Sequence, residues 1–240
     1  MKRFPAPSLM IALSALAVWG PLGTKPARAA IGCTLTNPAQ DLKYLFPEMT
    51  SYREELRELH RMKDGRALYE ALKGRLGSDL DAVYETYETP YTVYTVFRGR
   101  EVIGIVHGVN VPGQGGLIQV FLSADPRTGA IRQVFFQRLE SVASRALRSR
   151  DYLAQFKDLT LADFYKHDYY RVTKSGNAED KVARIKSPVS DEKGRKDAFA
   201  SLRGVRKNLI LLDIFIYERR FEAVYRETQA ALEKLKGSGG

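Results

Sequence analysis

Cysteine, histidine and the short motifs of common enzymes are scarce or missing in this chain of 240 residues. Cys33 is the only cysteine, so no disulfide can form within one chain. The three histidines, His60, His107 and His167, have no spacing that predicts a metal site. The sequence also contains no P-loop, HExxH, nucleophile elbow or CxxCH, which removes the usual support for nucleotidase, zinc-protease, hydrolase and c-type haem functions.

Long apolar runs are missing too, because a membrane span needs about 20 such residues. The uncharged run at 8–20 is shorter than that; Lys2 and Arg3 precede it, and an Ala-Arg-Ala site follows at 27–29. A basic start, a short apolar run and a small-x-small site predict a secretory signal peptide over 1–29. We therefore expect a periplasmic or otherwise exported protein.

Cys33 leaves three possibilities open. Residues 30–32 resemble a loose lipobox, which would make Cys33 the acylated N-terminus of a lipoprotein, although a stretch with two cations separates it from the apolar run. Otherwise, an unpaired cysteine in an exported protein indicates a buried, unreactive thiol or a bond to another molecule.

The charge is basic, but only moderately so. The first 29 residues hold four cations and no acids, so the rest of the chain has 34 Lys and Arg against 28 Asp and Glu, a net charge of +6. Such a surplus suits anionic phosphate ligands or a membrane surface. Nucleic acid is not an expected partner, because the sequence has no recognisable nucleic-acid-binding module.

The period of the hydrophobic pattern changes along the chain. Apolar residues recur at helical spacing over 36–80, again over 147–164, and in one long stretch over 197–236. Between the first two segments, β-branched and aromatic runs predict four strands. These strands lie at 91–97, 101–109, 117–124 and 131–138. Short turns between successive strands predict an antiparallel meander and an α+β fold.

The expected organisation has four parts. It consists of the signal peptide (1–29), an N-terminal helical segment (30–80), an α+β domain (81–210) and a long C-terminal helix (197–236).

Residues 113–140 resemble part of a known family. Gly116-Leu117-Ile118 opens a strand, a D-x-x-G turn follows at 125–129, and the next strand ends in Leu139-Glu140. This stretch resembles the core hairpin of the FMN-binding domain in the exported flavoprotein subunits of Na⁺-pumping NADH:quinone reductase and the Rnf electron-transport complex. Shorter matches at 45–47 and 152–156 keep the family's order of elements over residues 42–210.

One departure from the family changes the expected cofactor chemistry. In the family, a Ser/Thr-Gly-Ala-Thr/Ser motif carries the hydroxyl that is esterified to the FMN phosphate. The corresponding stretch is 197–205, where Arg203 stands in place of the acceptor threonine. The resemblance therefore implies a degenerate member without the covalent flavinylation motif, which binds FMN non-covalently or binds none.

If FMN is bound, the resemblance implies a protein that relays electrons within a membrane redox complex. Glycines let backbone approach the ring, and two cations near a helix start hold the phosphate. The expected cofactor-binding residues are Gly115, Gly116, Leu117, Glu140, Ser201, Arg203 and Lys207. No metal and no catalytic residue is expected.

If no flavin is bound, the two cations belong to an ordinary solvated helix face. The chain is then a flavin-free module that docks on another exported protein, or on a second copy of itself, through the C-terminal helix. The apolar side of that helix is formed by Leu209, Leu212, Phe215 and Ile216.

Overall fold

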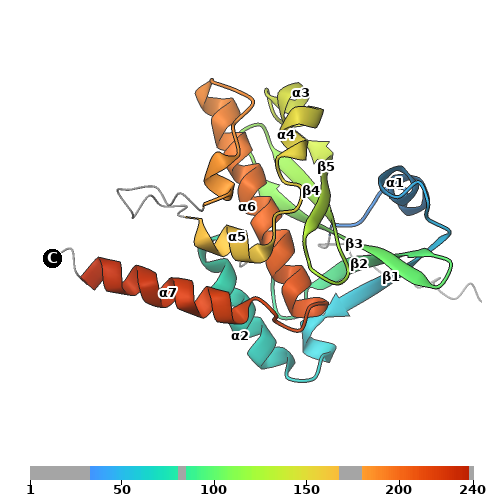
Figure 1. The fold of residues 1–240 in the computed structure, drawn as a ribbon, viewed down its shortest axis with the longest axis horizontal. Coiled ribbons are helices and arrows are strands. Elements are labelled where there is room, and N and C mark those ends of the chain that lie inside the picture. Colours follow the sequence, from blue (N-terminus) through green and yellow to red (C-terminus); the bar gives the residue numbers. More distant parts are fainter. Residues whose placement is uncertain (1–32, 81–84, 168–179, 238–240) are drawn as a thin grey trace, which may run out of the picture.

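A five-stranded antiparallel sheet forms the centre of the protein, with its strands in the order they have along the chain (Figure 1). The computed structural model describes residues 33–80, 85–167 and 180–237, so the expected signal peptide over 1–29 lies outside the described residues. The strands are β1 (Ser51–Glu58), β2 (Pro90–Arg98), β3 (Glu101–Pro112), β4 (Leu117–Ala124) and β5 (Ile131–Leu139). The predicted meander and the α+β class are confirmed.

Helices lie on both faces of the sheet (Figure 1). The long helix α6 (Glu192–Phe215) packs on β3 and β4 and is flanked by α2 (Gly65–Leu76) and α5 (Leu161–Lys166). α7 (Glu222–Gly237) packs against α5. On the other face, α1 (Pro38–Leu45) covers a smaller apolar cluster. The short helices α3 (Ser144–Leu147) and α4 (Arg150–Ala154) follow β5, so the predicted helix over 147–164 is in fact interrupted.

The expected N-terminal helical segment is wrong at residues 51–58, which form β1. Tyr52, Leu56 and Leu59 have helical spacing, yet Tyr52 and Leu56 are 36% and 64% exposed. β1 pairs with β2 along its whole length, from Ser51 opposite Phe97 onward. Pairing with β2 outweighs a weak local preference for helix.

The expected single helix over 197–236 is two helices, α6 and α7. Glu218 and Arg219 between them have positive φ angles of 53° and 60°, which a continuing helix cannot accommodate. The apolar residues that were expected to face a partner, Leu209, Leu212 and Phe215, are at most 6% exposed and belong to the core. The C-terminal docking surface proposed from the sequence is therefore internal to the fold.

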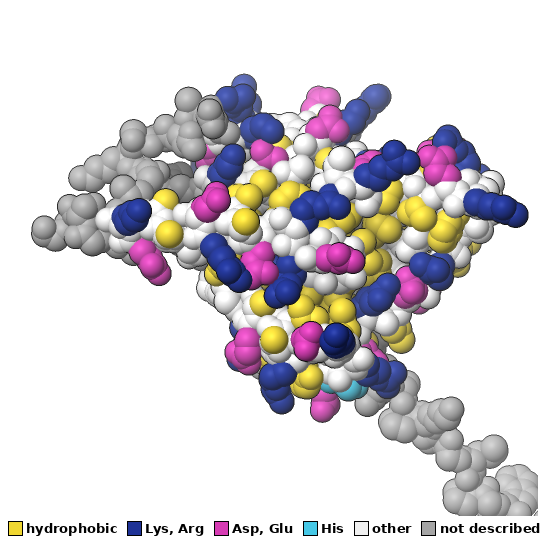
Figure 2. Space-filling model, turned by 60° about the horizontal axis from the view of Figure 1, so that its bottom comes forward, with side chains coloured by type: hydrophobic (Ala, Val, Ile, Leu, Met, Phe, Trp, Pro, Cys, Tyr) yellow, Lys and Arg dark blue, Asp and Glu magenta, His cyan; other side chains and the backbone are white. Residues whose placement is uncertain are grey.

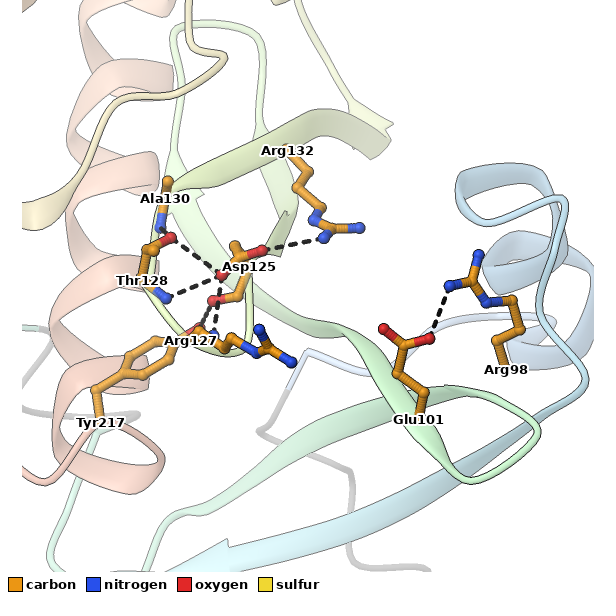
Figure 3. A network of polar contacts seen from close by, with 8 residues as sticks. All are labelled: Arg98, Glu101, Asp125, Arg127, Thr128, Ala130, Arg132 and Tyr217. Atoms are coloured by element: carbon orange, nitrogen blue, oxygen red, sulfur yellow. Dashed lines mark hydrogen bonds and ion pairs between the residues drawn. The ribbon is translucent and has the colours of Figure 1, made fainter.

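The D-x-x-G turn between β4 and β5 is held by its own aspartate (Figure 3). Asp125 Oδ1 accepts hydrogen bonds from the amides of Arg127 and Thr128, both at 2.9 Å, and Oδ2 accepts one from Arg132 at 3.0 Å. Desolvation opposes ionisation, but these donors lower the pKa of Asp125 to about 2. Tyr217 donates to the Asp125 carbonyl at 2.8 Å and so ties the turn to the end of α6.

The sheet and α6 are joined by a buried polar pair, His107 on β3 and Asn208 on α6. Asn208 Nδ2 donates to the carbonyls of Val120 and Gly204, so its Oδ1 is the acceptor of the 2.7 Å bond with His107 Nδ1. His107 Nδ1 therefore carries a proton. Complete burial outweighs this bond and lowers the pKa of His107 to about 4.

This burial predicts a loss of stability in acid. Between about pH 6.5 and pH 4, the unfolded chain takes up a proton at His107 that the folded chain refuses, so stability falls as the pH falls through this window. The full loss is about 3 kcal/mol. Urea unfolding at pH 7 and pH 4.5 should show it, and His107→Gln should flatten the difference. His60→Gln, at an exposed histidine, is the control; if both variants follow the parent chain, His107 does not titrate in this way.

Cys33 is 5% exposed and packs in the cluster under α1. Burial raises the pKa of its thiol to about 12, so the thiolate that reacts is scarce at neutral pH. Of the three possibilities for this residue, the packing supports the unreactive buried thiol.

Within the described ranges, no helix combines the length and the apolar character that a membrane crossing requires.

Candidate functional site

A hollow of about 650 Å³ in the described surface runs along the N-terminal half of α6. That volume lies in the range of small-molecule sites. The hollow is lined by residues of the β3–β4 loop, α4, the segment before α6, and α6 itself. These residues are Pro112, Gln114, Tyr152, Ile185, Ser187, Glu192, Arg195, Lys196, Ala198, Phe199, Ala200, Leu202 and Arg203.

Two smaller hollows, of about 270 and 370 Å³, adjoin the first, and Arg203 lines all three. Ser78 and Asp79, which follow α2, line both smaller hollows. Phe199 lines the 650 Å³ and the 370 Å³ hollows and is 42% exposed. Arg203 and its neighbours thus stand at the junction of one branched cleft.

Cations outnumber acids around the 650 Å³ hollow. Arg195, Lys196 and Arg203 line it, against Glu192 alone. Lys196 pairs with Glu192 at 2.7 Å. Arg195 donates to the Ser190 carbonyl and, among the described residues, forms no ion pair within 4 Å. Together with the exposed ring of Phe199, this lining suits a ligand with a flat apolar part and a negative charge.

Arg203 is not where the sequence placed it relative to the helix. α6 begins at Glu192, well before Arg203, so the predicted contribution of a helix N-terminus to phosphate binding at this residue is wrong. Arg203 Nε donates to Asp79 Oδ1 at 2.5 Å, and Arg206 donates to the other oxygen of Asp79 at 2.8 Å. Arg203 remains 37% exposed and can still present donors to the cleft.

Lys207 lines the 270 Å³ hollow, but its charge is used within the fold. Its Nζ lies 2.5 Å from Glu85 Oε1, and the two side chains are 4% and 10% exposed. A ligand phosphate would have to compete with this carboxylate in a desolvated place. The geometry therefore explains Lys207 as the buried half of an ion pair.

Ser201 does not reach the cleft. It is fully buried, and its hydroxyl donates to the Asp197 carbonyl one turn earlier at 2.8 Å. Ser201 is the only hydroxyl residue of the described stretch 197–205, so no hydroxyl there is placed to form an ester with a flavin phosphate. The residues present fit a non-covalent flavin but not a covalent one.

Four of the predicted residues, Gly115, Gly116, Leu117 and Glu140, do come together. Glu140 Oε2 accepts the Leu117 amide at 3.1 Å, and a Cβ on Gly116 would lie 1.9 Å from that same oxygen. Gly116 also has φ +136°, which glycine tolerates and other residues do not. Arg138 and the Leu117 amide lower the pKa of Glu140. The space that the missing side chain of Gly116 leaves open is therefore filled by the Glu140 side chain.

Asp197 is the site residue that the sequence reasoning missed. It is fully buried, yet its Oδ1 accepts the Gln114 amide at 2.7 Å and its Oδ2 accepts the Ser141 hydroxyl at 2.5 Å. This carboxylate ties the glycine loop and the chain after β5 to α6, and so builds one wall of the cleft. The sequence does contain a signal for it: Asp197 shares helical spacing with Ser201 and Asn208, and all three lie on the face of α6 that packs inward.

Comparison with known proteins finds two similar chains among the solved structures. No protein-family profile matches the sequence, and no curated protein is similar to it in sequence. The crystal structure of NqrC from Shewanella oneidensis aligns with 84% of this chain and 93% of its own, at 16% identity and a TM-score of 0.43. At this identity and TM-score, the likeness assigns neither a family nor a function to the chain.

Proposed function

We propose that this chain is an exported flavoprotein that holds FMN without a covalent bond and relays electrons in a membrane-associated redox system. The observation that carries the proposal is the branched cleft around Arg203, with its surplus of cations and its exposed aromatic ring. The sequence adds the order of elements that resembles the FMN-binding domain. Export rests on the pattern of residues 1–29.

The chain's own part in this function is binding and positioning. Arg195 and Arg203 supply guanidinium donors of the kind that recognise a phosphate. Phe199 supplies an apolar face against which a flat ring can pack. The flavin, when bound, supplies the redox chemistry, and the protein sets its position and surroundings.

The direct test is a titration of the purified full chain with FMN, followed by flavin fluorescence and the visible spectrum. We expect saturable binding and the release of all flavin into the supernatant on acid precipitation. A chain that is colourless as purified and takes up no added FMN would sink the electron-carrier hypothesis and favour a flavin-free module. Flavin retained by the acid precipitate would contradict the non-covalent assignment.

Arg203→Ala and Arg195→Ala should each weaken FMN binding by roughly tenfold or more, since a hydrogen bond to a charged group contributes about 1.5–3 kcal/mol. Arg206 keeps its bond to Asp79 when Arg203 is removed, so the fold should survive. Arg100→Ala, at the exposed β2–β3 turn, is the matched control and should leave affinity unchanged. If all three variants bind FMN like the parent chain, the cleft is not the flavin site.

A further inference from the structure

The outer edge of the sheet at β1 is a second surface that lacks a partner within the described chain. β1 is a terminal strand, paired with β2 on one side only. Its side chains are mostly exposed, including Tyr52 at 36% and Leu56 at 64%. Figure 2 brings the bottom of the Figure 1 view forward, and hydrophobic side chains are interspersed on that face with charges of both signs. An edge strand also leaves backbone N–H and C=O groups that can pair with another strand.

The charges of β1 differ from those of an edge strand that is only protected against pairing. Proteins commonly block edge strands with lysines, whose like charges repel a second copy. β1 has no lysine and carries both signs in the order Arg53, Glu54, Glu55, with Arg57 further on. Such a strand can be complementary to itself.

We propose that two copies of this chain pair antiparallel through β1, around a two-fold axis at Glu54, and join their sheets into one. Successive residues of a strand direct their backbone groups to opposite edges. Two identical strands can therefore pair only if residues of the same parity face each other, which places the axis on a residue and never between two residues.

With the axis at Glu54, the complementary side chains meet. Tyr52 faces Leu56 of the partner copy, and Leu56 faces its Tyr52, on the face that carries α1. Arg53 faces Glu55, again twice, on the face that carries α6. Cross-strand pairs of opposite charge, and aromatic–aliphatic pairs, each stabilise a sheet by roughly 0.2–1 kcal/mol. The one unfavourable contact is Glu54 with its own copy.

No other position of the axis within β1 gives more opposite-charge contacts than like-charge contacts. An axis one residue later places Arg53 opposite Arg57 twice. An axis two residues later places Glu55 opposite Arg57 twice, but it also places Glu54 opposite Glu58 twice. An axis one residue earlier places Arg53 opposite itself and pairs no opposite charges within the strand. Directly opposed like charges destabilise a sheet. The sequence of β1 therefore selects the register centred on Glu54.

Sedimentation equilibrium of the full chain over a range of concentrations tests this dimer. We expect a concentration-dependent dimer, at least tenfold weaker with Arg53→Glu or Glu55→Arg, because each single change turns two attractive cross-strand contacts into repulsive ones. The double variant Arg53→Glu/Glu55→Arg exchanges the charges and should restore the parent affinity. Arg145→Glu, an exposed charge reversal on α3, is the control and should change nothing.

Glu54→Gln separates this register from any other use of the edge. It removes the single like-charge contact on the axis and should tighten the dimer several-fold. A chain that is monomeric at every concentration, a double variant as weak as the singles, or a Glu54→Gln variant that weakens the dimer would each overturn the proposal. Circular dichroism of every variant verifies that the exposed changes leave the fold intact. The dimer does not depend on flavin, so it can fail or hold independently of FMN binding.

Discussion

Asp213→Ala is expected to lower the free energy of unfolding by about 3–5 kcal/mol, because it leaves a charged guanidinium buried without its counter-ion. Asp213 Oδ2 lies 2.5 Å from Arg75 Nη2, and the two side chains are 0% and 2% exposed. Arg75 also donates to the Tyr165 hydroxyl at 2.6 Å. This one pair joins α2 to α6 and brings α5 alongside them. Urea unfolding, followed by circular dichroism, measures the loss.

Two comparison variants show whether the charge, rather than the packing, is responsible. Arg75→Met combined with Asp213→Leu removes both charges and should be more stable than Asp213→Ala alone, since apolar residues of similar size often replace a buried ion pair at little cost. Glu101→Ala breaks the exposed pair with Arg98 seen in Figure 3 and should leave the unfolding midpoint unchanged. A single Asp213→Ala variant as stable as the parent chain would show that Arg75 finds another partner.

The sheet was largely predictable because strands β2 to β5 carry their own signals. β-branched and aromatic runs and the turn at Asp125 are local properties, and the structure keeps them within a residue or a few. β1 was not predictable in the same way. Its residues, such as Glu54 and Arg57, have a low propensity for β-strands, and they are extended because they pair with β2.

The break between α6 and α7 in the C-terminal region could not be predicted from a local pattern either. The apolar spacing continues from α6 into α7, so periodicity alone cannot locate the break between them. The break is set by tertiary contacts: Asp213 Oδ1 accepts the Phe221 amide at 3.3 Å, and the Asp213 carbonyl accepts the Arg219 amide at 2.8 Å. A residue that interrupts an apolar run in the sequence is thus the one that turns the chain in the fold.

The candidate site was predictable in part, for a similar reason. Arg203 was singled out by its place in a resemblance, and it does stand in the cleft. Its partner Asp79 and the wall residue Asp197 are far away in sequence from the groups they hold, Arg203 and Gln114. No local pattern marks contacts of that kind, which arise only when α6 lies across the sheet.

Asp197→Ala should have the largest effect on the cleft itself. It leaves the Gln114 amide and the Ser141 hydroxyl without their acceptor in a buried place, so we expect a loss of about 3 kcal/mol in unfolding free energy. The β3–β4 loop would lose its tie to α6, and FMN binding should weaken with it. Amide hydrogen exchange at Gln114 should accelerate first, because in the parent chain that N–H is protected by a single 2.7 Å hydrogen bond, which it donates to Asp197.

Two further variants test this effect: Asp197→Asn should give an intermediate result, and Asp151→Ala is the control. Asparagine keeps one side-chain oxygen for the Gln114 amide, so exchange there should lie between the parent chain and Asp197→Ala. Asp151 is an exposed acid on α4, and its removal should change neither exchange nor stability. Arg203→Ala should weaken FMN while leaving exchange at Gln114 unchanged, whereas Asp197→Ala should change both. If Asp197→Ala accelerates exchange but binds FMN as well as the parent chain, this wall of the cleft does not contact the ligand.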